Sequence, residues 1–252
     1  MTELRGWRAR LDRARPYLEQ RGLLALLLIA GCAWIFVALA DEVMEQENHA
    51  FDTAILLALR HPADHADPLG PGWLEEFGRD VTALGGVGVL AFITLAAVGL
   101  LWMQGRRGRA WLMLAAVVGG QALSSLFKYG FDRPRPDLVP HGALVYTASF
   151  PSGHSMMAAV TYLTLGALIA QSQRETALRI YIMALAVLVT IAVGISRVYL
   201  GVHWPTDVLA GWAAGAAWAT FCLIVAQAID RRRRARRGPL SGDGGGSPRR
   251  PG

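Results

Sequence analysis

Apolar residues gather in six long segments of this chain, and most charged residues lie between them or at the two ends. The segments cover roughly residues 22–40, 83–103, 110–127, 151–171, 177–195 and 208–229. A helix needs about 20 apolar residues to cross the hydrocarbon core of a bilayer, and most of the segments approach that length. A soluble core accounts for one or two such runs, but not for six. The pattern predicts an all-α fold, a polytopic membrane protein built as a six-transmembrane-helix bundle.

The apolar segments divide the chain into three parts. Residues 22–229 are predicted to form the membrane domain, residues 1–21 a basic amino-terminal segment, and residues 230–252 a basic tail. The tail is rich in Arg, Gly and Pro and has little apolar surface to bury, so we expect it to be disordered. Attraction to anionic headgroups is one role for its arginines, and ordinary anchoring at the membrane face explains them as well.

The charges predict an orientation for the bundle. Six arginines lie in the first 21 residues, three in the linker 104–109 and eight in the tail, whereas loop 41–80 has ten acidic residues and two arginines. Basic residues favour the cytoplasmic side. We therefore expect both termini inside the cell, and 41–80, 128–150 and 196–207 outside. This anchoring accounts for the net charge of +6, so no nucleic-acid partner is predicted.

A variant of this topology has five spans. The sequence ALADE at 38–42 resembles the small-residue site at which signal peptides are cleaved. The apolar stretch before it is longer than the usual core of about 7–15 residues, which favours an uncleaved anchor. Cleavage would remove the first span and leave the later loops on the same sides of the membrane.

Three polar clusters lie on the expected outer side. They are KYGFDRPRP at 128–136, FPSGHS at 150–155 and SRVYLGVHWPTD at 196–207. Charged residues near a membrane are costly and by default indicate a functional site. A single Arg or Lys is also explained by its reaching out to the headgroups. The functional interpretation therefore depends on the three clusters together.

His203 and Asp207 are four residues apart in the third cluster. If a helix starts near Trp204, both lie on one face and the carboxylate reaches an imidazole nitrogen. Pro205 suits a first helical turn, where its missing N–H is not needed. A carboxylate bonded to Nδ1–H leaves Nε2 with an exposed lone pair, as a nucleophile or base requires. A lone histidine beside a membrane is commonly an interfacial side chain. A histidine paired with an aspartate four residues later instead indicates a catalytic role.

The residues around this histidine predict an anion site. Three positive charges would surround it, from Lys128, Arg135 and Arg197. Such a cluster matches a phosphoryl group, whose charge spreads over several oxygens in the transition state. Ser152 and Gly153 open a helix, where unpaired N–H groups favour an anion, although a plain N-cap explains this turn too. His154 adds a second imidazole that could protonate a leaving oxygen.

Together the clusters resemble the three-part signature of the type 2 phosphatidic acid phosphatase family of integral membrane lipid phosphatases. KYGFDRPRP fits K-x6-R-P, PSGH forms the second motif, and SRVYLGVHWPTD fits S-R-x5-H-x3-D. The resemblance covers roughly half of the chain, from the third expected span to the sixth. It implies a six-helix fold and a phosphohistidine mechanism that uses neither a metal ion nor another cofactor.

The resemblance also implies a role for each matching residue. His203 attacks phosphorus, Asp207 orients and polarises His203, and His154 protonates the leaving oxygen and later activates water. The residues implied to hold the phosphoryl oxygens are Lys128, Arg135, Ser152, Gly153 and Arg197. Arg133 falls outside the strict pattern and receives no role.

The implied reaction is removal of the terminal phosphate from a membrane lipid phosphate or diphosphate. The expected location is a bacterial inner membrane, with the site facing the periplasm or the cell exterior. Undecaprenyl diphosphate is the first expected substrate, followed by phosphatidylglycerol phosphate and phosphatidic acid, and then by lipid A phosphate. No motif predicts an oligomeric state.

Two other functions are compatible with parts of this pattern. Vanadium-dependent haloperoxidases share the anion-site motifs, but those considered are soluble, and six spans would have no role in them. A transporter or non-catalytic binder of lipid headgroups would use the basic cluster. Binding alone, however, does not require His154 together with the pair His203 and Asp207.

Overall fold

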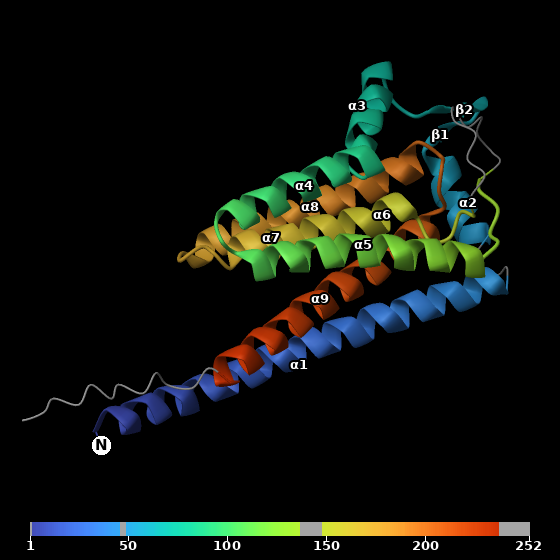
Figure 1. Cartoon of the computed structure of the whole chain (residues 1–252). Coiled ribbons are helices and arrows are strands. Elements are labelled where there is room, and N and C mark those ends of the chain that lie inside the picture. Colours follow the sequence, from blue (N-terminus) through green and yellow to red (C-terminus); the bar gives the residue numbers. More distant parts are fainter. Residues whose placement is uncertain (1, 46–48, 137–147, 237–252) are drawn as a thin grey trace, which may run out of the picture.

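The computed structural model describes residues 2–45, 49–136 and 148–236, most of which are helical. The elements in chain order are α1 (Thr2–Met44), α2 (His49–Ala58), β1 (Arg60–His61), β2 (Asp64–Pro68), α3 (Gly72–Ala83), α4 (Val87–Met103), α5 (Arg107–Gly130), α6 (Gly153–Ala158), the π-helix η1 (Ala159–Leu163), α7 (Thr164–Ala170), α8 (Thr176–Tyr199) and α9 (Pro205–Arg236). The long helices run along one another, and α2, α3 and the two strands gather at one end of the bundle (Figure 1).

Five helical segments are long and apolar enough to cross a membrane, and a bent pair of helices supplies a sixth candidate span. They are Gly22–Met44, Arg107–Gly130, Gly153–Ala170, Thr176–Tyr199 and Pro205–Arg233. The pair is α3 with α4, bent by 46°. The span expected at 83–103 thus becomes the 17-residue helix α4, continued at an angle by α3. The predicted polytopic helical fold is confirmed, and the count is six when the bent pair is one span.

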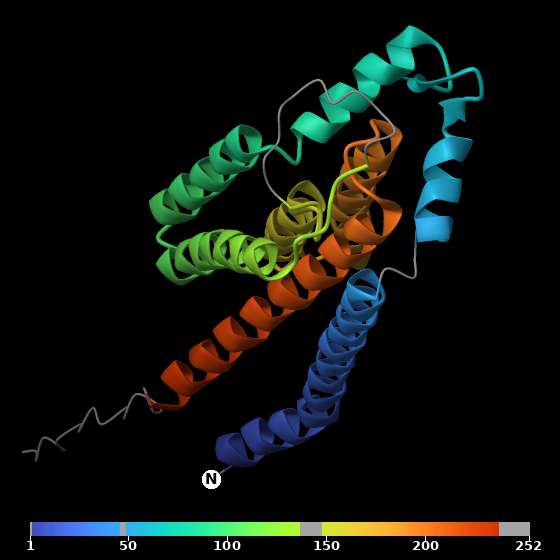
Figure 2. The ribbon, with the colours of Figure 1, turned by 90° about the vertical axis from the view of Figure 1, so that its right-hand side faces the viewer.

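The segment Gly153–Ala170 forms the centre of the bundle. It combines α6, η1 and α7 and is the most buried candidate span. The buried share of its apolar stretch is 61%, against 11% for the span within α1. The helices α5, α8 and α9 pack against it, while α1 contacts α9 at the edge of the bundle (Figure 2). A central helix that begins in the second polar cluster therefore brings that cluster against three other helices.

Two glycines of α9 allow its close contact with α6. A Cβ atom on Gly211 would lie 2.7 Å from the carbonyl oxygen of Ser152, and one on Gly215 would lie 2.5 Å from that of Met156. Both distances are shorter than any real contact of a side chain, so glycine is required at each position. The small-residue pattern of α9 is therefore used for helix packing within one subunit.

The region expected as the outward loop 41–80 is largely ordered. It contains α2, α3 and the strands β1 and β2, which pair antiparallel. In the third polar cluster, α8 continues to Tyr199, so only residues 200–204 separate it from α9. The polar segments are thus held on or between helices, which fixes their side chains better than a free loop would.

The ends of the chain differ from the expected division into three parts. Helix α1 begins at Thr2, so the basic amino-terminal segment continues directly into the first span. Helix α9 runs to Arg236, and the first part of the expected disordered tail, 230–236, is helical, because arginine and alanine are good helix formers. The rest of that tail, 237–252, and the stretch 137–147 of the expected outer loop lie outside the described residues.

Candidate active site

The three polar clusters meet where several helices begin or end. Lys128 lies in the last turn of α5 and Arg197 in the last turn of α8, and α6 and α9 begin at the same end of the bundle. Gly201 has a φ of 70°, which lets the chain leave α8 in a tight turn. Pro205 then starts α9 with a preset backbone angle. This short connection places His203 beside the helix ends.

The carboxylate of Asp207 holds one side of the His203 ring. Its Oδ2 lies 3.3 Å from Nδ1 of His203, and both side chains are buried. The same oxygen accepts the backbone N–H of Trp204 at 3.0 Å and the hydroxyl of Ser149. The contact expected from the four-residue spacing is therefore present, and Ser149 adds a donor that the motif did not indicate.

The other side of the ring faces Arg135, whose Nη1 lies 3.2 Å from Nε2 of His203. A guanidinium only donates hydrogen bonds, so Nε2 is the acceptor and we assign the ring proton to Nδ1, next to Asp207. Arg135 also donates to the carbonyl oxygen of Val202 at 2.9 Å, which fixes its position. The ring thus presents a lone pair toward a cation, although His203 is more enclosed than the exposed nitrogen that the sequence predicts.

Burial lowers the pKa of His203 to about 4, from its ordinary value of 6.5. The hydrogen bond and negative charge of Asp207 oppose this shift, and the positive charges of Arg135 and Arg197 add to it. Burial also lowers the pKa of Arg135, which still carries its charge because a guanidinium titrates far above neutral pH. The imidazole is therefore neutral and the cluster beside it is cationic at pH 7.

His154 lies within reach of the same positive charges. The cations that interact with it electrostatically are Lys128, Arg135 and Arg197, and it interacts with His203 as well. A Cβ atom on Gly153 would lie 3.7 Å from Nζ of Lys128, so the ammonium group sits close to the start of α6. The structure therefore brings the predicted anion-binding residues and both histidines into one site.

Two of the predicted phosphate ligands are held in particular ways. Arg197 donates from Nη1 to the hydroxyl of Thr82 at 3.1 Å, while its Nε is buried with no partner among the described residues. A buried unpaired N–H is costly, and an anion oxygen would satisfy it. The backbone N–H of Ser152 already donates to the carbonyl oxygen of Asp207 at 2.9 Å, which ties α6 to α9. A role of Ser152 in binding an anion therefore depends on its hydroxyl.

A buried charge network that the motifs do not include lies behind Asp207. Arg133 donates from Nη1 to Oδ1 of Asp207 and from Nη2 to Oδ2 of Asp52, each at 2.6 Å. Asp52 also accepts the backbone N–H of Thr206 at 2.9 Å and its hydroxyl at 2.6 Å. Asp52 and Asp207 have no exposed surface, and Arg133 is 8% exposed.

The motifs do not predict this network. They assign no role to Arg133 and do not include Asp52, Ser149 or Thr206. The signal in the sequence is that Asp52 is the one charged residue in the apolar stretch 51–59, FDTAILLAL. Within the described ranges 2–45, 49–136 and 148–236, no three His, Cys, Asp or Glu side chains gather as metal ligands.

Comparison with known proteins places the chain in a family. The family model of the PAP2 superfamily matches residues 109–231, which include all three motifs. Phosphatidylglycerophosphatase B of Bacillus subtilis is 36% identical over 154 residues, covering 57% of this chain and 70% of that protein. The chain belongs to the PAP2 superfamily. The resemblance inferred from the motifs is therefore confirmed.

Further PAP2 relatives agree with this assignment. The crystal structure of a transmembrane PAP2 type phosphatidylglycerolphosphate phosphatase from Bacillus subtilis has a TM-score of 0.64 and 26% identity, covering 82% of this chain and 96% of that one. Undecaprenyl-diphosphatase of Sulfolobus acidocaldarius is 28% identical over 159 residues, covering 60% of this chain and 66% of that protein. The prediction that this chain is a membrane lipid phosphatase is confirmed at the level of the enzyme class.

Proposed function

We propose that this PAP2 phosphatase removes the terminal phosphate of a lipid phosphate or diphosphate through a phosphohistidine on Nε2 of His203. The observation that carries the proposal is the setting of this ring. Asp207 holds Nδ1, and Nε2 faces Arg135 at 3.2 Å. A phosphoryl oxygen that binds to the guanidinium would bring phosphorus next to the Nε2 lone pair.

In the first half-reaction, the Nε2 lone pair of His203 attacks phosphorus while the bond from phosphorus to the leaving oxygen breaks. The ring becomes positively charged, and Asp207 stabilises it. His154 gives a proton to the leaving oxygen, which belongs to a lipid alcohol or to a lipid monophosphate. The transferring oxygens are held by Lys128, Arg135 and Arg197, with Ser152 and Gly153 at the start of α6.

In the second half-reaction, a water molecule attacks phosphorus and gives a proton to His154. The phosphorus–nitrogen bond breaks, Nε2 of His203 regains its lone pair, and inorganic phosphate leaves. The negative charge on the transferring oxygens and the positive charge on the His203 ring would both be stabilised by side chains of this chain. We therefore propose a reaction without a metal ion.

Two lipids are our leading substrates. The relative with 36% identity is named as a phosphatidylglycerophosphatase and the one with 28% identity as an undecaprenyl-diphosphatase. We therefore propose phosphatidylglycerol phosphate as the first candidate substrate. Undecaprenyl diphosphate, the first expected substrate from the sequence alone, becomes the second candidate. The arginines at the start of α5 and in the last turns of α9 lie at the opposite end of these helices from His203. We accordingly propose a bacterial inner-membrane protein whose site faces outward.

Phosphate release by purified protein in detergent tests the function. The assay contains EDTA and offers phosphatidylglycerol phosphate, undecaprenyl diphosphate and phosphatidic acid in parallel. His203→Ala should release no phosphate, whereas His65→Ala, which removes an exposed histidine of β2, should match the wild type. Full activity of His203→Ala would refute the mechanism, and no release from any substrate would refute the proposed substrates.

Trapping the intermediate tests the roles of the two histidines. The substrate is radiolabelled undecaprenyl diphosphate, because its leaving phosphate needs little help from an acid and the loss of His154 should slow the first half-reaction least. His154→Ala should still accept the labelled phosphate but hydrolyse the phosphoenzyme slowly, since no base activates the water. The label should be acid-labile and stable to alkali, as a phosphohistidine is, and absent from the double variant with His203→Ala. An acid-stable label, or a label that persists without His203, would contradict the assignment of the nucleophile.

A further inference from the structure

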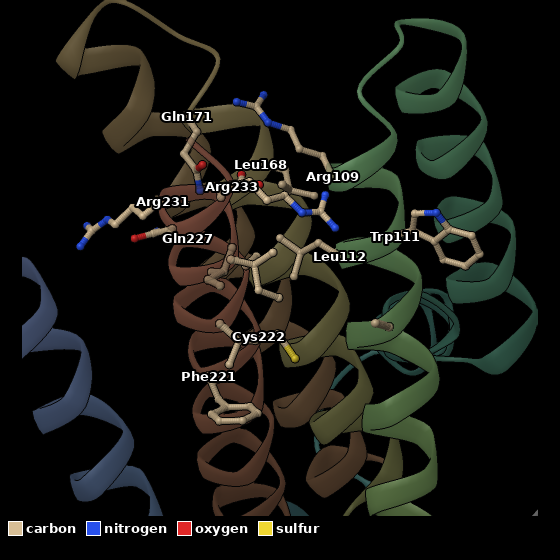
Figure 3. Close-up of a pocket in the computed structure, with 17 residues that line it drawn as sticks. Arg109, Trp111, Leu112, Leu168, Gln171, Phe221, Cys222, Gln227, Arg231 and Arg233 are labelled. Atoms are coloured by element: carbon tan, nitrogen blue, oxygen red, sulfur yellow. The ribbon is translucent and has the colours of Figure 1, made fainter. Parts of the chain in front are cut away.

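An open cavity lies at the opposite membrane face from His203. It has a volume of about 600 Å³ and is lined mainly by α5, α7 and α9 (Figure 3). Its walls include residues near the start of α5 and the far part of α9. Gln227, which lines it, is 20 residues beyond Asp207 on α9, and a helix rises about 1.5 Å per residue. The two sites are thus about 30 Å apart, which is the thickness of the hydrocarbon core.

The cavity has an apolar interior and a basic opening. Leu112, Leu168 and Phe221 lie inside it, on α5, α7 and α9. At its mouth, Arg109 of α5 and Arg233 of α9 extend across the opening from facing helices, whereas Arg231 points outward (Figure 3). Within the described part of the chain, neither the Arg109 guanidinium nor the Arg233 guanidinium has a hydrogen-bond or ion-pair partner.

We infer that this cavity binds an anionic phospholipid from the leaflet on the arginine-rich side. The lipid phosphate would lie between Arg109 and Arg233, whose planar groups each offer paired N–H donors to phosphate oxygens. The acyl chains would lie against the apolar interior. Basic pockets between membrane helices are known sites for anionic headgroups, and a cationic mouth over an apolar floor has the complementary chemistry.

The lining also distinguishes this lipid from a substrate. Of the described residues that line the cavity, none is a histidine, so no nucleophile of the kind proposed for His203 is present. Asp230 is the acidic residue of the lining, and its single negative charge leaves the mouth positive beside Arg109, Arg231 and Arg233. A bound lipid would join α5 to α9, and binding to the folded state alone stabilises it.

Native mass spectrometry can test this binding. Phosphatidylglycerol and phosphatidylcholine with the same acyl chains are titrated onto the full chain. Arg109→Gln with Arg233→Gln should weaken phosphatidylglycerol binding about 30-fold, the factor for losing two basic contacts near a membrane surface. Arg174→Gln with Arg232→Gln is the matched control, because it removes the same charge from exposed residues outside the cavity. Wild-type turnover of both variants would show that each is folded.

Equal loss in the two double variants would mean that only net charge matters, and would overturn the inference. Equal binding of phosphatidylcholine would overturn it too. Excess inorganic phosphate should fail to displace the lipid, because the acyl chains contribute to binding. Displacement by phosphate alone would show a simple anion site instead.

The two cysteines of the chain locate the lipid. Cys222 lines the cavity, whereas Cys32 lies on α1, and the two thiols are similarly half-buried. Phosphatidylglycerol should slow maleimide modification of Cys222 and leave Cys32 unchanged. Equal protection of both thiols, or of neither, would show that the lipid binds elsewhere and would overturn the inference.

Discussion

The carboxylate of Asp52 lies behind the proposed nucleophile, and replacing it with asparagine tests how the charge network supports catalysis. Asp52→Asn keeps the size of the side chain and the acceptor for the backbone N–H of Thr206. It removes one negative charge from the chain of contacts that runs from Asp52 through Arg133 to Asp207. Arg133 would then be neutralised by Asp207 alone.

The expected size of the effect follows from the distances. Arg133 spans the two carboxylates with contacts of 2.6 Å on each side, so they lie about 7 Å apart across one guanidinium. The ring of His203 lies beyond Asp207, on the order of 10 Å from Asp52, and at an effective dielectric constant of about 20 a unit charge at that distance contributes roughly 1.5 kcal/mol. The attack makes the ring of His203 positive, and losing this negative charge raises the barrier. We expect kcat to fall about tenfold.

Substrate binding should respond differently. The phosphate is negative and binds on the Arg135 side of the ring, away from Asp52, so KM should stay the same or fall slightly. The acid limb of kcat/KM should also move to lower pH, because a ring with less negative charge behind it protonates less readily. Asp80→Asn is the matched control, because Asp80 is exposed on α3 and loses the same charge. It should leave both constants and the limb unchanged.

The assay is a steady-state phosphate-release profile over pH for the wild type and the two variants. The substrate phosphate ionises near pH 6 and changes the pH profile of kcat/KM in the same way for all three proteins. A difference between their profiles therefore comes from ionisation of the enzyme. Thermal unfolding should show Asp52→Asn to be less stable by about 2–3 kcal/mol, because a buried charge loses one of two partners. A loss of stability with unchanged kcat and an unchanged limb would refute an electrostatic role and leave a purely structural one.

Three further predictions concern other parts of the site. Burial lowers the pKa of His203 to about 4, and the neutral ring is the proposed nucleophile, so kcat/KM should decline only as the pH drops below about 4, not near 6.5. A pH profile corrected for substrate ionisation checks this. Ser149→Ala leaves Asp207 without one donor and should lower kcat several-fold, with about 1–2 kcal/mol less stability, in turnover and unfolding assays. Gly215→Leu should force α9 away from α6 and cost about 3 kcal/mol or more in thermal unfolding, whereas Gly99→Leu, with open space around it, should not.

The membrane-spanning helices and the pairing of His203 with Asp207 could be predicted from local sequence because each depends on spacing. Apolar length predicts a span, and the spacing of four from His203 to Asp207 predicts one helical face. Both hold in the structure, where Asp207 reaches Nδ1 at 3.3 Å. The bend between α3 and α4 was missed because α3 carries exposed charged residues and its contribution to a span depends on its neighbour. Hydropathy averaged along the chain does not indicate that two helices joined at an angle form one span.

The residues missed at the site have a different cause, which Arg133 and Asp52 illustrate. They are 81 positions apart, and their pairing arises only when α2 folds against the start of α9. A motif defined by fixed spacing within one segment cannot include a partner so distant. Yet burial favours the pairing, because a carboxylate as buried as that of Asp52 is costly without a charged partner. A polar residue inside an apolar amphipathic stretch, such as Asp52 in 51–59, therefore indicates a buried partner elsewhere in the chain. Arg133, the basic residue of the first polar cluster to which the resemblance assigns no role, is that partner.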